Sequence, residues 1–84
     1  MGIKRRKQPK HLGAKLKELR NRRDVSQAQM AALLNEPDPG VISRYEHGER
    51  EPSLLTLLEY ARLARISMEV LVDDNLTLPK RRSM

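Results

Sequence analysis

The apolar and polar positions of this chain follow a helical period from residue 12 onward. Leu12, Leu16 and Leu19 recur at intervals of four and three residues, and charged side chains occupy the positions between them. This spacing places the three leucines on one face of an α-helix. The pattern predicts a first helix that begins at Leu12 and ends near Arg23–Asp24.

A helix-start signal follows at once. Ser26 and Gln29 have the spacing of a capping box, with Ser26 as the N-cap and Gln29 at the third helical position. Val25 and Met30 are placed to form the hydrophobic staple that accompanies such a box. We predict a second helix that runs to about residue 34 and buries Met30 and Leu33.

We predict a turn at residues 35–38, because Pro37 and Pro39 each disfavour helical backbone in the residue that precedes them. Asp38 can cap the next helix, Pro39 suits its first position and Gly48 suits its end. The third helix therefore covers residues 39–47, and Ile42 and Tyr45, three residues apart, form its buried face.

Two further helices are predicted in the C-terminal half. The fourth starts at Pro52–Ser53 and ends near Ala64, and Ser67 caps a short fifth helix that holds Val70 and Leu71. No segment alternates as a strand does, so we expect an all-α fold of five short helices. The fourth helix carries a broad apolar stripe, formed by Leu54, Leu57, Leu58, Ala61 and Ala64.

Charge separates the ends of the chain from its middle. The net charge of the 84 residues is +6, yet residues 11–79 have a net charge of −2, because the first ten residues carry +5 and the last five carry +3. We predict a basic flexible arm at 1–10, a domain at 11–74 and a C-terminal tail at 75–84. Basic tails suit phosphate groups, whose neutralisation dominates nonspecific nucleic-acid affinity. A solubilising end is the alternative.

Composition excludes several kinds of site. The chain has no cysteine, and its two histidines, His11 and His47, lack the spacing of a metal site. No apolar run approaches the roughly 20 residues that span a bilayer, and no apolar segment follows the basic N-terminus as a secretory signal requires. We expect no cofactor, no metal and no membrane association, and an intracellular location.

Four segments in order resemble the phage-repressor helix-turn-helix family, the lambda-repressor-like or Cro-type (XRE) DNA-binding domain. They are LGAKLKELR, VSQAQMAALL, VISRYEHGEREPSLLTLLEYA and ISMEVLVDD, and together they cover residues 12–72. The resemblance implies a compact five-helix domain whose third helix enters the major groove. It also implies that Ala31 lies where two helices cross closely, and that Arg20 and Glu46 form a structural ion pair.

This chain departs from the family pattern at three positions. Asp24, Asn35 and Arg65 stand where the family often has glycine. Asp and Asn tolerate a left-handed backbone, whereas Arg65 adopts it with strain. The turn before the third helix is also one residue longer than in the shorter phage repressors, so the resemblance defines the position of that helix in the groove only to within about one residue.

The resemblance assigns DNA-binding roles position by position. Arg44 is the strongest candidate for reading a base, since a bidentate guanidinium on guanine is the commonest specific contact. The residues that match groove-facing positions are Pro39, Gly40, Ser43 and Arg44. Those that match phosphate-contacting positions are Ser26, Gln27, His47 and Arg50. The cations of the arm, which can follow the backbone or enter the minor groove, are Lys4, Arg5, Arg6, Lys7 and Lys10.

We therefore predict a sequence-specific regulator of transcription that binds double-stranded DNA as a homodimer on a palindromic site. It is a repressor or an antitoxin that regulates its own operon, with a toxin or other protein as a second partner. The alternative is a protein-interaction adaptor with this fold and little DNA specificity, which the acidic residues Glu46, Glu49 and Glu51 favour. An enzyme is disfavoured, because no nucleophile accompanies these glutamates.

Overall fold

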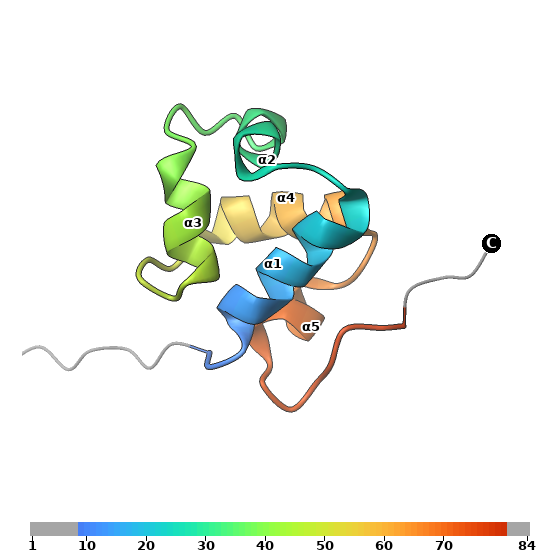
Figure 1. Ribbon diagram of the computed structural model, residues 1–84. Helices are drawn as coiled ribbons and strands as arrows, with labels where there is room; N and C mark the ends of the chain where they lie inside the picture. The colour runs from blue at the N-terminus through green and yellow to red at the C-terminus, as the bar shows by residue number, and fades with distance from the viewer. Residues whose placement is uncertain (1–8, 81–84) are drawn as a thin grey trace, which may run out of the picture.

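A computed structural model describes residues 9–80 of the chain. This part contains five helices and no strand, which confirms the all-α prediction (Figure 1). The helices are α1 (Leu12–Arg23), α2 (Gln27–Leu33), α3 (Gly40–Glu46), α4 (Leu54–Ala64) and α5 (Met68–Val72). Their bounds lie within one or two residues of those predicted from the sequence.

Helix α1 is the centre of the fold. It packs against α3, α4 and α5, while α2 packs against α3 at the periphery (Figure 1). The buried leucines of α1 are the predicted Leu12, Leu16 and Leu19. The rest of the buried apolar core consists of Met30, Ala31, Val41, Ile42, Tyr45, Leu57, Tyr60, Ala61 and Leu71.

Serine side chains cap three of the helices as expected. Ser26, Ser53 and Ser67 each accept a hydrogen bond from the backbone N–H three residues later. Such a cap satisfies one of the free N–H groups at a helix start. The left-handed backbone also occurs at the three predicted positions, with φ of 59° at Asp24, 57° at Asn35 and 57° at Arg65.

The prediction that Leu33 is buried is wrong, and Leu54 on the apolar stripe of α4 is exposed as well. Leu33 is 42% exposed, because α2 packs mainly against α3 and presents Met30 and Ala31 to the core. Leu54 is 72% exposed, since it is the first residue of α4 and extends beyond the face formed by Leu57 and its neighbours. The period of apolar residues along a helix identifies its apolar face. How much of that face is buried depends on how far the neighbouring helices extend along it.

Lys15 is buried although the sequence pattern places it on a polar face of α1. Its Nζ donates hydrogen bonds to the carbonyl oxygens of Val70, at 2.7 Å, and Asp73, at 3.0 Å. These carbonyls lie at the end of α5, where helices leave C=O groups unpaired and favour a positive charge. Lys15 therefore joins the central helix to the last one.

Residues 75–80, assigned to the C-terminal tail from the sequence, return along α1. Leu78 is half-buried and packs against the core of the domain. Arg22 Nη1 donates to the carbonyl oxygen of Pro79 at 2.8 Å. The backbone N–H groups of Lys10 and His11 donate to the carboxylate of Asp74, and these bonds hold the pKa of Asp74 below its usual range. The ends of the described segment are thus held against the domain.

Candidate nucleic-acid interface

Local hydrogen bonds stabilise the start of α2 and the connection from α2 to α3. The predicted capping box is present: Ser26 Oγ accepts from the N–H of Gln29 at 3.0 Å, and Gln29 Oε1 accepts from the N–H of Ser26 at 2.8 Å. After α2, the N–H of Glu36 donates to the carbonyl oxygen of Ala31 at 2.8 Å, across the left-handed Asn35. Ala31 is itself buried in the core, as expected for a small residue where α2 and α3 pack closely.

Arg20 and Glu46 join three parts of the fold. Arg20 Nε lies 2.6 Å from Glu46 Oε2, and its Nη2 donates to Oε1 at 3.1 Å, which makes the pair bidentate. Arg20 Nη1 also donates to the carbonyl oxygen of Val25 at 2.9 Å. The bond to Glu46 is the main cause that raises the pKa of Arg20. The pair fixes the end of α3 to α1 and to the start of α2.

The pair is nearly sealed from water. The exposed fraction of the side chain is 12% for Arg20 and 2% for Glu46. Gln27 Nε2 donates to Glu46 Oε1 at 3.1 Å, so this amide at the start of α2 is oriented by the same carboxylate. Glu46 is therefore an internal brace and contributes little to the outer surface of α3.

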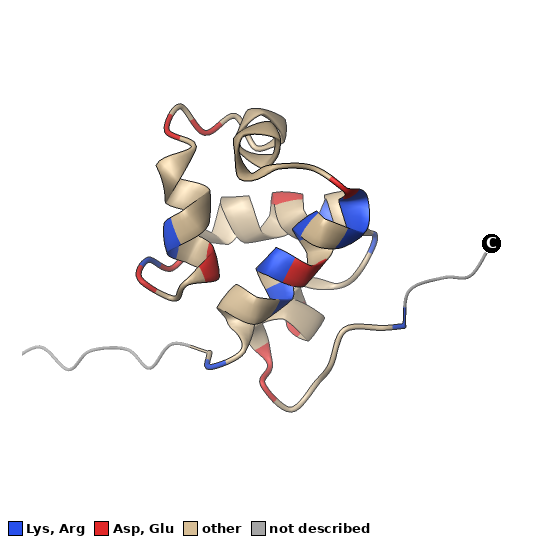
Figure 2. Cartoon of the chain, viewed as in Figure 1, with Lys and Arg blue, Asp and Glu red and all other residues tan. Residues whose placement is uncertain are grey.

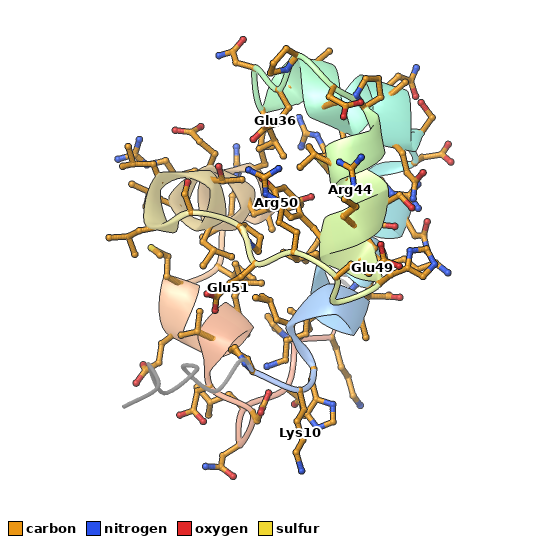
Figure 3. All side chains as sticks on the ribbon, turned by 90° about the vertical axis from the view of Figure 1, so that its left-hand side faces the viewer. Lys10, Glu36, Arg44, Glu49, Arg50 and Glu51 are labelled. Carbon is orange, nitrogen blue, oxygen red and sulfur yellow. The ribbon has the colours of Figure 1, made fainter. Side chains whose placement is uncertain are left out.

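The outward face of α3 carries the residues predicted to read DNA. Gly40 and Arg44 are exposed and Ser43 is half-buried, whereas Ile42 and Tyr45 lie on the opposite, buried face. Arg44 projects from the face of the molecule seen in Figure 3. Its Nη1 lies 3.5 Å from Asp38 Oδ2. Pro39 is exposed at the N-cap position of the helix.

His47 and Ser43 interact with each other at the end of α3. His47 Nδ1 lies 2.8 Å from the carbonyl oxygen of Ser43 and 3.3 Å from its Oγ. The imidazole is exposed, as are Ser26 at the start of α2 and Arg50 beyond α3. The phosphate-contacting roles of these residues and of Gln27 stay predictions.

Carboxylates flank the outward face of α3 on both sides. Glu36 and Asp38 precede the helix in the chain, and Glu49 and Glu51 follow it; Figure 3 labels the three glutamates. Glu36 accepts a hydrogen bond from the Tyr45 hydroxyl at 3.2 Å. Burial, then the charge of Glu36, raises the pKa of Tyr45. The surface around α3 is consequently mixed in charge rather than uniformly basic.

Residues 16–71 match the model of the Helix-turn-helix family HTH_3, which is of the lambda-repressor/Cro or XRE type. The chain belongs to this family. The prediction from its four sequence segments is confirmed, and the helix-turn-helix domain is that of a DNA-binding regulator of transcription. No curated protein and no solved structure gives a significant match to it.

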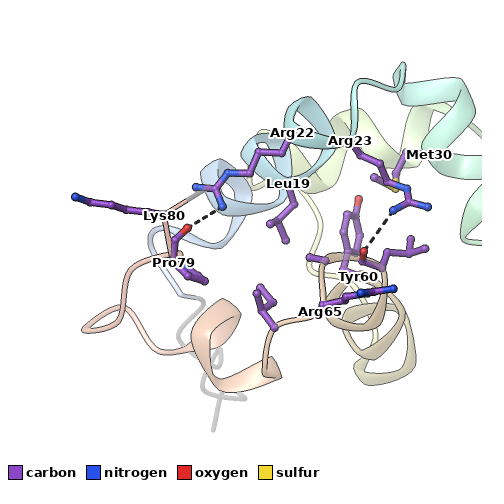
Figure 4. Close-up of a pocket in the computed structure, with 11 residues that line it drawn as sticks. Leu19, Arg22, Arg23, Met30, Tyr60, Arg65, Pro79 and Lys80 are labelled. Carbon is purple, nitrogen blue, oxygen red and sulfur yellow. Dashed lines mark hydrogen bonds between the residues drawn. The ribbon is translucent and has the colours of Figure 1, made fainter. Parts of the chain in front are cut away.

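The helix-turn-helix domain also has a hollow that α3 does not line (Figure 4). Its volume is about 490 Å³, and it lies between the ends of α1 and α4 and the segment at Pro79. Arg22 donates to the Pro79 carbonyl oxygen at 2.8 Å, and Arg23 Nη1 donates to that of Leu63 at 3.4 Å. Through these bonds the two arginines of α1 link it to the segment at Pro79 and to the end of α4.

Four cations of the predicted arm, Lys4, Arg5, Arg6 and Lys7, lie outside the described residues. Lys10 is described, exposed, and labelled in Figure 3. Within residues 9–80, no group of three His, Cys, Asp or Glu side chains could hold a metal ion. No helix in that range is both long and apolar enough to cross a membrane.

The sequence pattern indicates only a capping role for Asp38. Its carboxylate contacts both the start of α3 and the guanidinium of Arg44. The signal in the sequence is the spacing of Asp38, which stands two residues before Gly40 at the helix start and six residues before Arg44. That spacing becomes informative only once the helix bounds are known.

Proposed function

We propose that this protein is a sequence-specific regulator that places α3, the centre of the predicted recognition segment 39–47, in the major groove of double-stranded DNA. The observation that carries the proposal is the division of α3 into two faces. Ile42 and Tyr45 anchor the inner face in the core, and Arg44 stands on the outer face. A recognition helix needs this combination of a rigid base and exposed polar side chains.

In this proposal Arg44 reads guanine through its O6 and N7 atoms. Ser43 contacts a base or a phosphate at short range, and Pro39 and Gly40 allow close approach to the groove. Ser26, Gln27, His47 and Arg50 contact the backbone on either side, where phosphate contacts set position rather than sequence. The acidic residues around α3 reduce the nonspecific attraction, so the proposal also assigns phosphate contacts to the basic arm.

The proposal extends to a repressor, or an antitoxin-type regulator of its own operon, in the prokaryotic cytoplasm. It binds as a homodimer to two half-sites about one helical turn apart. A toxin is the second partner in the antitoxin case. Membership of the helix-turn-helix family supports this extension.

Selection from a random double-stranded DNA library tests the function directly. We expect the wild-type protein to enrich one sequence with two-fold symmetry. Arg44→Ala should relax the preference at one base pair in each half-site and weaken binding by about 1–3 kcal/mol. Arg62→Ala is the matched control, because Arg62 is an exposed arginine on α4 that lies 3.7 Å from Glu59; it should leave the selected sequence unchanged.

Two outcomes would contradict these assignments. Equal weakening on every sequence would make Arg44 a phosphate ligand. No enrichment by the wild-type protein would favour the second candidate, an interaction adaptor, which the acidic surroundings of α3 support.

A further inference from the structure

We infer that Asp38 is a positioning residue for Arg44 and thereby determines how strictly the protein discriminates between DNA sequences. The inference rests on the proposed function, in which α3 enters the major groove. It adds a residue that touches no base itself and acts through the guanidinium that does.

The carboxylate of Asp38 is held in place by the backbone of α3. Its Oδ1 accepts a hydrogen bond from the N–H of Gly40 at 2.9 Å. Its Oδ2 lies 3.5 Å from Arg44 Nη1, six residues further along the chain. One carboxylate therefore joins the start of the helix to the side chain on its outward face, nearly two turns away.

Gly40 provides the space for this arrangement. A Cβ atom at residue 40 would lie 3.2 Å from Asp38 Oδ1, which is tighter than ordinary van der Waals contact. Because Gly40 has no such atom, the Asp38 carboxylate can lie against the first turn of the helix and still reach toward Arg44.

Two of the other carboxylates around α3 have partners elsewhere. Glu46 is bound by Arg20 and Gln27, and Glu36 accepts from the Tyr45 hydroxyl. Among the described residues with assigned contacts, the carboxylate placed against Arg44 is that of Asp38.

The contact is weak, and its weakness suits this role. The exposed fraction of the side chain is 47% for Arg44 and 63% for Asp38, so water competes for both groups. The ion pair restricts the rotamers of the Arg44 side chain without fixing a single one. Binding DNA with Arg44 in the restricted orientation therefore costs less conformational entropy. Asp38 also repels phosphate, so a site that offers Arg44 only phosphate gains less than one that offers guanine.

A cycle of four proteins tests the inference: wild type, Asp38→Asn, Arg44→Ala and the double variant. The amide of Asn can still accept from the Gly40 N–H, so the helix start is kept while the charge is removed. For each protein we would measure the affinity ratio between the selected site and the same site changed at the base pair that Arg44 governs. Asp38→Asn should lower this ratio about two- to fivefold, and should not change it further when Arg44 is already Ala.

Asp38→Glu separates position from charge. It keeps the negative charge but moves it by one methylene, so it should lose discrimination as Asp38→Asn does while its affinity for random DNA stays at the wild-type value. Glu59→Gln removes a charge of the same sign beside Arg62 and should leave the ratio unchanged. Circular dichroism melting curves confirm that each variant is folded.

The result that would overturn the inference is a uniform rise in affinity for all DNA after Asp38→Asn, in both backgrounds, with Asp38→Glu equal to wild type. Asp38 would then only repel phosphate. An affinity ratio for Asp38→Asn equal to that of Glu59→Gln would overturn it as well. Failure of the proposed function is distinct, since it would show as an absence of enrichment by the wild-type protein before any variant is measured.

Discussion

Among the described residues, the Tyr60 hydroxyl is a buried polar group without a hydrogen-bond partner. The ring lies in the core next to the Arg20–Glu46 pair, whose charges act on it. Burial is the main cause that raises the pKa of Tyr60, and the negative charge of Glu46 adds to it. The Tyr60 hydroxyl therefore destabilises the folded state, because it loses its hydrogen bonds to water on burial and gains none in return.

Tyr60→Phe should raise the free energy of unfolding at pH 7 by about 1 kcal/mol, because it removes that hydroxyl and keeps the ring. Urea unfolding at pH 7 measures the change. A loss of stability in the variant would show that the hydroxyl is bound by a group such as an ordered water.

The same variant tests the pH dependence. Above the ordinary tyrosine pKa of 10.0, the unfolded chain loses a proton that folded Tyr60 retains, so wild-type stability falls as pH rises. The slope for one such group is about 1.4 kcal/mol per pH unit. Tyr60→Phe removes the contribution of Tyr60 to this slope. Stability of the variant should still fall with pH, but less steeply than that of wild type, because the pKa of Tyr45 is also raised. Equal slopes in the two proteins would contradict the assignment.

At the scale of the elements, the position of α3 depends on how closely α1 approaches it. A Cβ atom at Gly13 would lie 2.7 Å from the carbonyl oxygen of Glu46 and 2.9 Å from that of Tyr45. Gly13 therefore lets the first turn of α1 lie directly against the end of α3. Together with the Arg20–Glu46 pair, this contact sets the angle at which α3 is presented.

Gly13→Ala should lower stability by about 1–3 kcal/mol. In an isolated helix the same change would be favourable by about 1 kcal/mol, because Ala is the better helix former. Here the added methyl group pushes α1 away from the backbone of α3. Thermal unfolding followed by circular dichroism measures the effect, with Lys17→Ala at an exposed position of α1 as the control. A gain in stability would refute the close approach.

At the scale of the whole molecule, charge is distributed unevenly between the domain and its ends. All 11 acidic residues of the chain lie within the described segment, where they balance the basic residues, and the excess positive charge lies in residues 1–8 and 81–84. The cartoon in Figure 2 accordingly has both blue and red segments in and next to α3. A domain of this kind gains little nonspecific affinity for DNA from its folded part.

Replacing Lys4, Arg5, Arg6 and Lys7 by Ala should weaken binding to the selected DNA and flatten its dependence on salt. The slope of log K against log salt should fall by about 0.9 for each phosphate that these residues neutralise. Titrations between 50 and 200 mM salt, roughly the range over which the effect is large, measure the slope, and Arg62→Ala serves as the control. A slope equal to that of wild type would exclude the arm from the complex.

The helices could be predicted from the sequence because their signals are local. The spacing of Leu12, Leu16 and Leu19 and the capping box at Ser26 depend on residues within a turn or two of each other. The burial of Lys15 and the exposure of Leu33 and Leu54 could not be predicted, since they depend on which distant element covers each position. Among candidate site residues, exposure of Arg44 followed from the period of α3, whereas its contact with Asp38 required the helix start to be in place.

Local sequence patterns are sufficient to predict the order of the helices, their caps and the basic character of the ends, because hydrogen bonds within one turn and apolar periodicity encode them. The Arg20–Glu46 pair was expected from the resemblance to the family. In contrast, the bond from Lys15 to the end of α5, the packing of Leu78 on the core and the bond from Gln27 to Glu46 are visible only in the folded chain. Each of these contacts joins residues far apart in the chain, and no local spacing encodes such a distance.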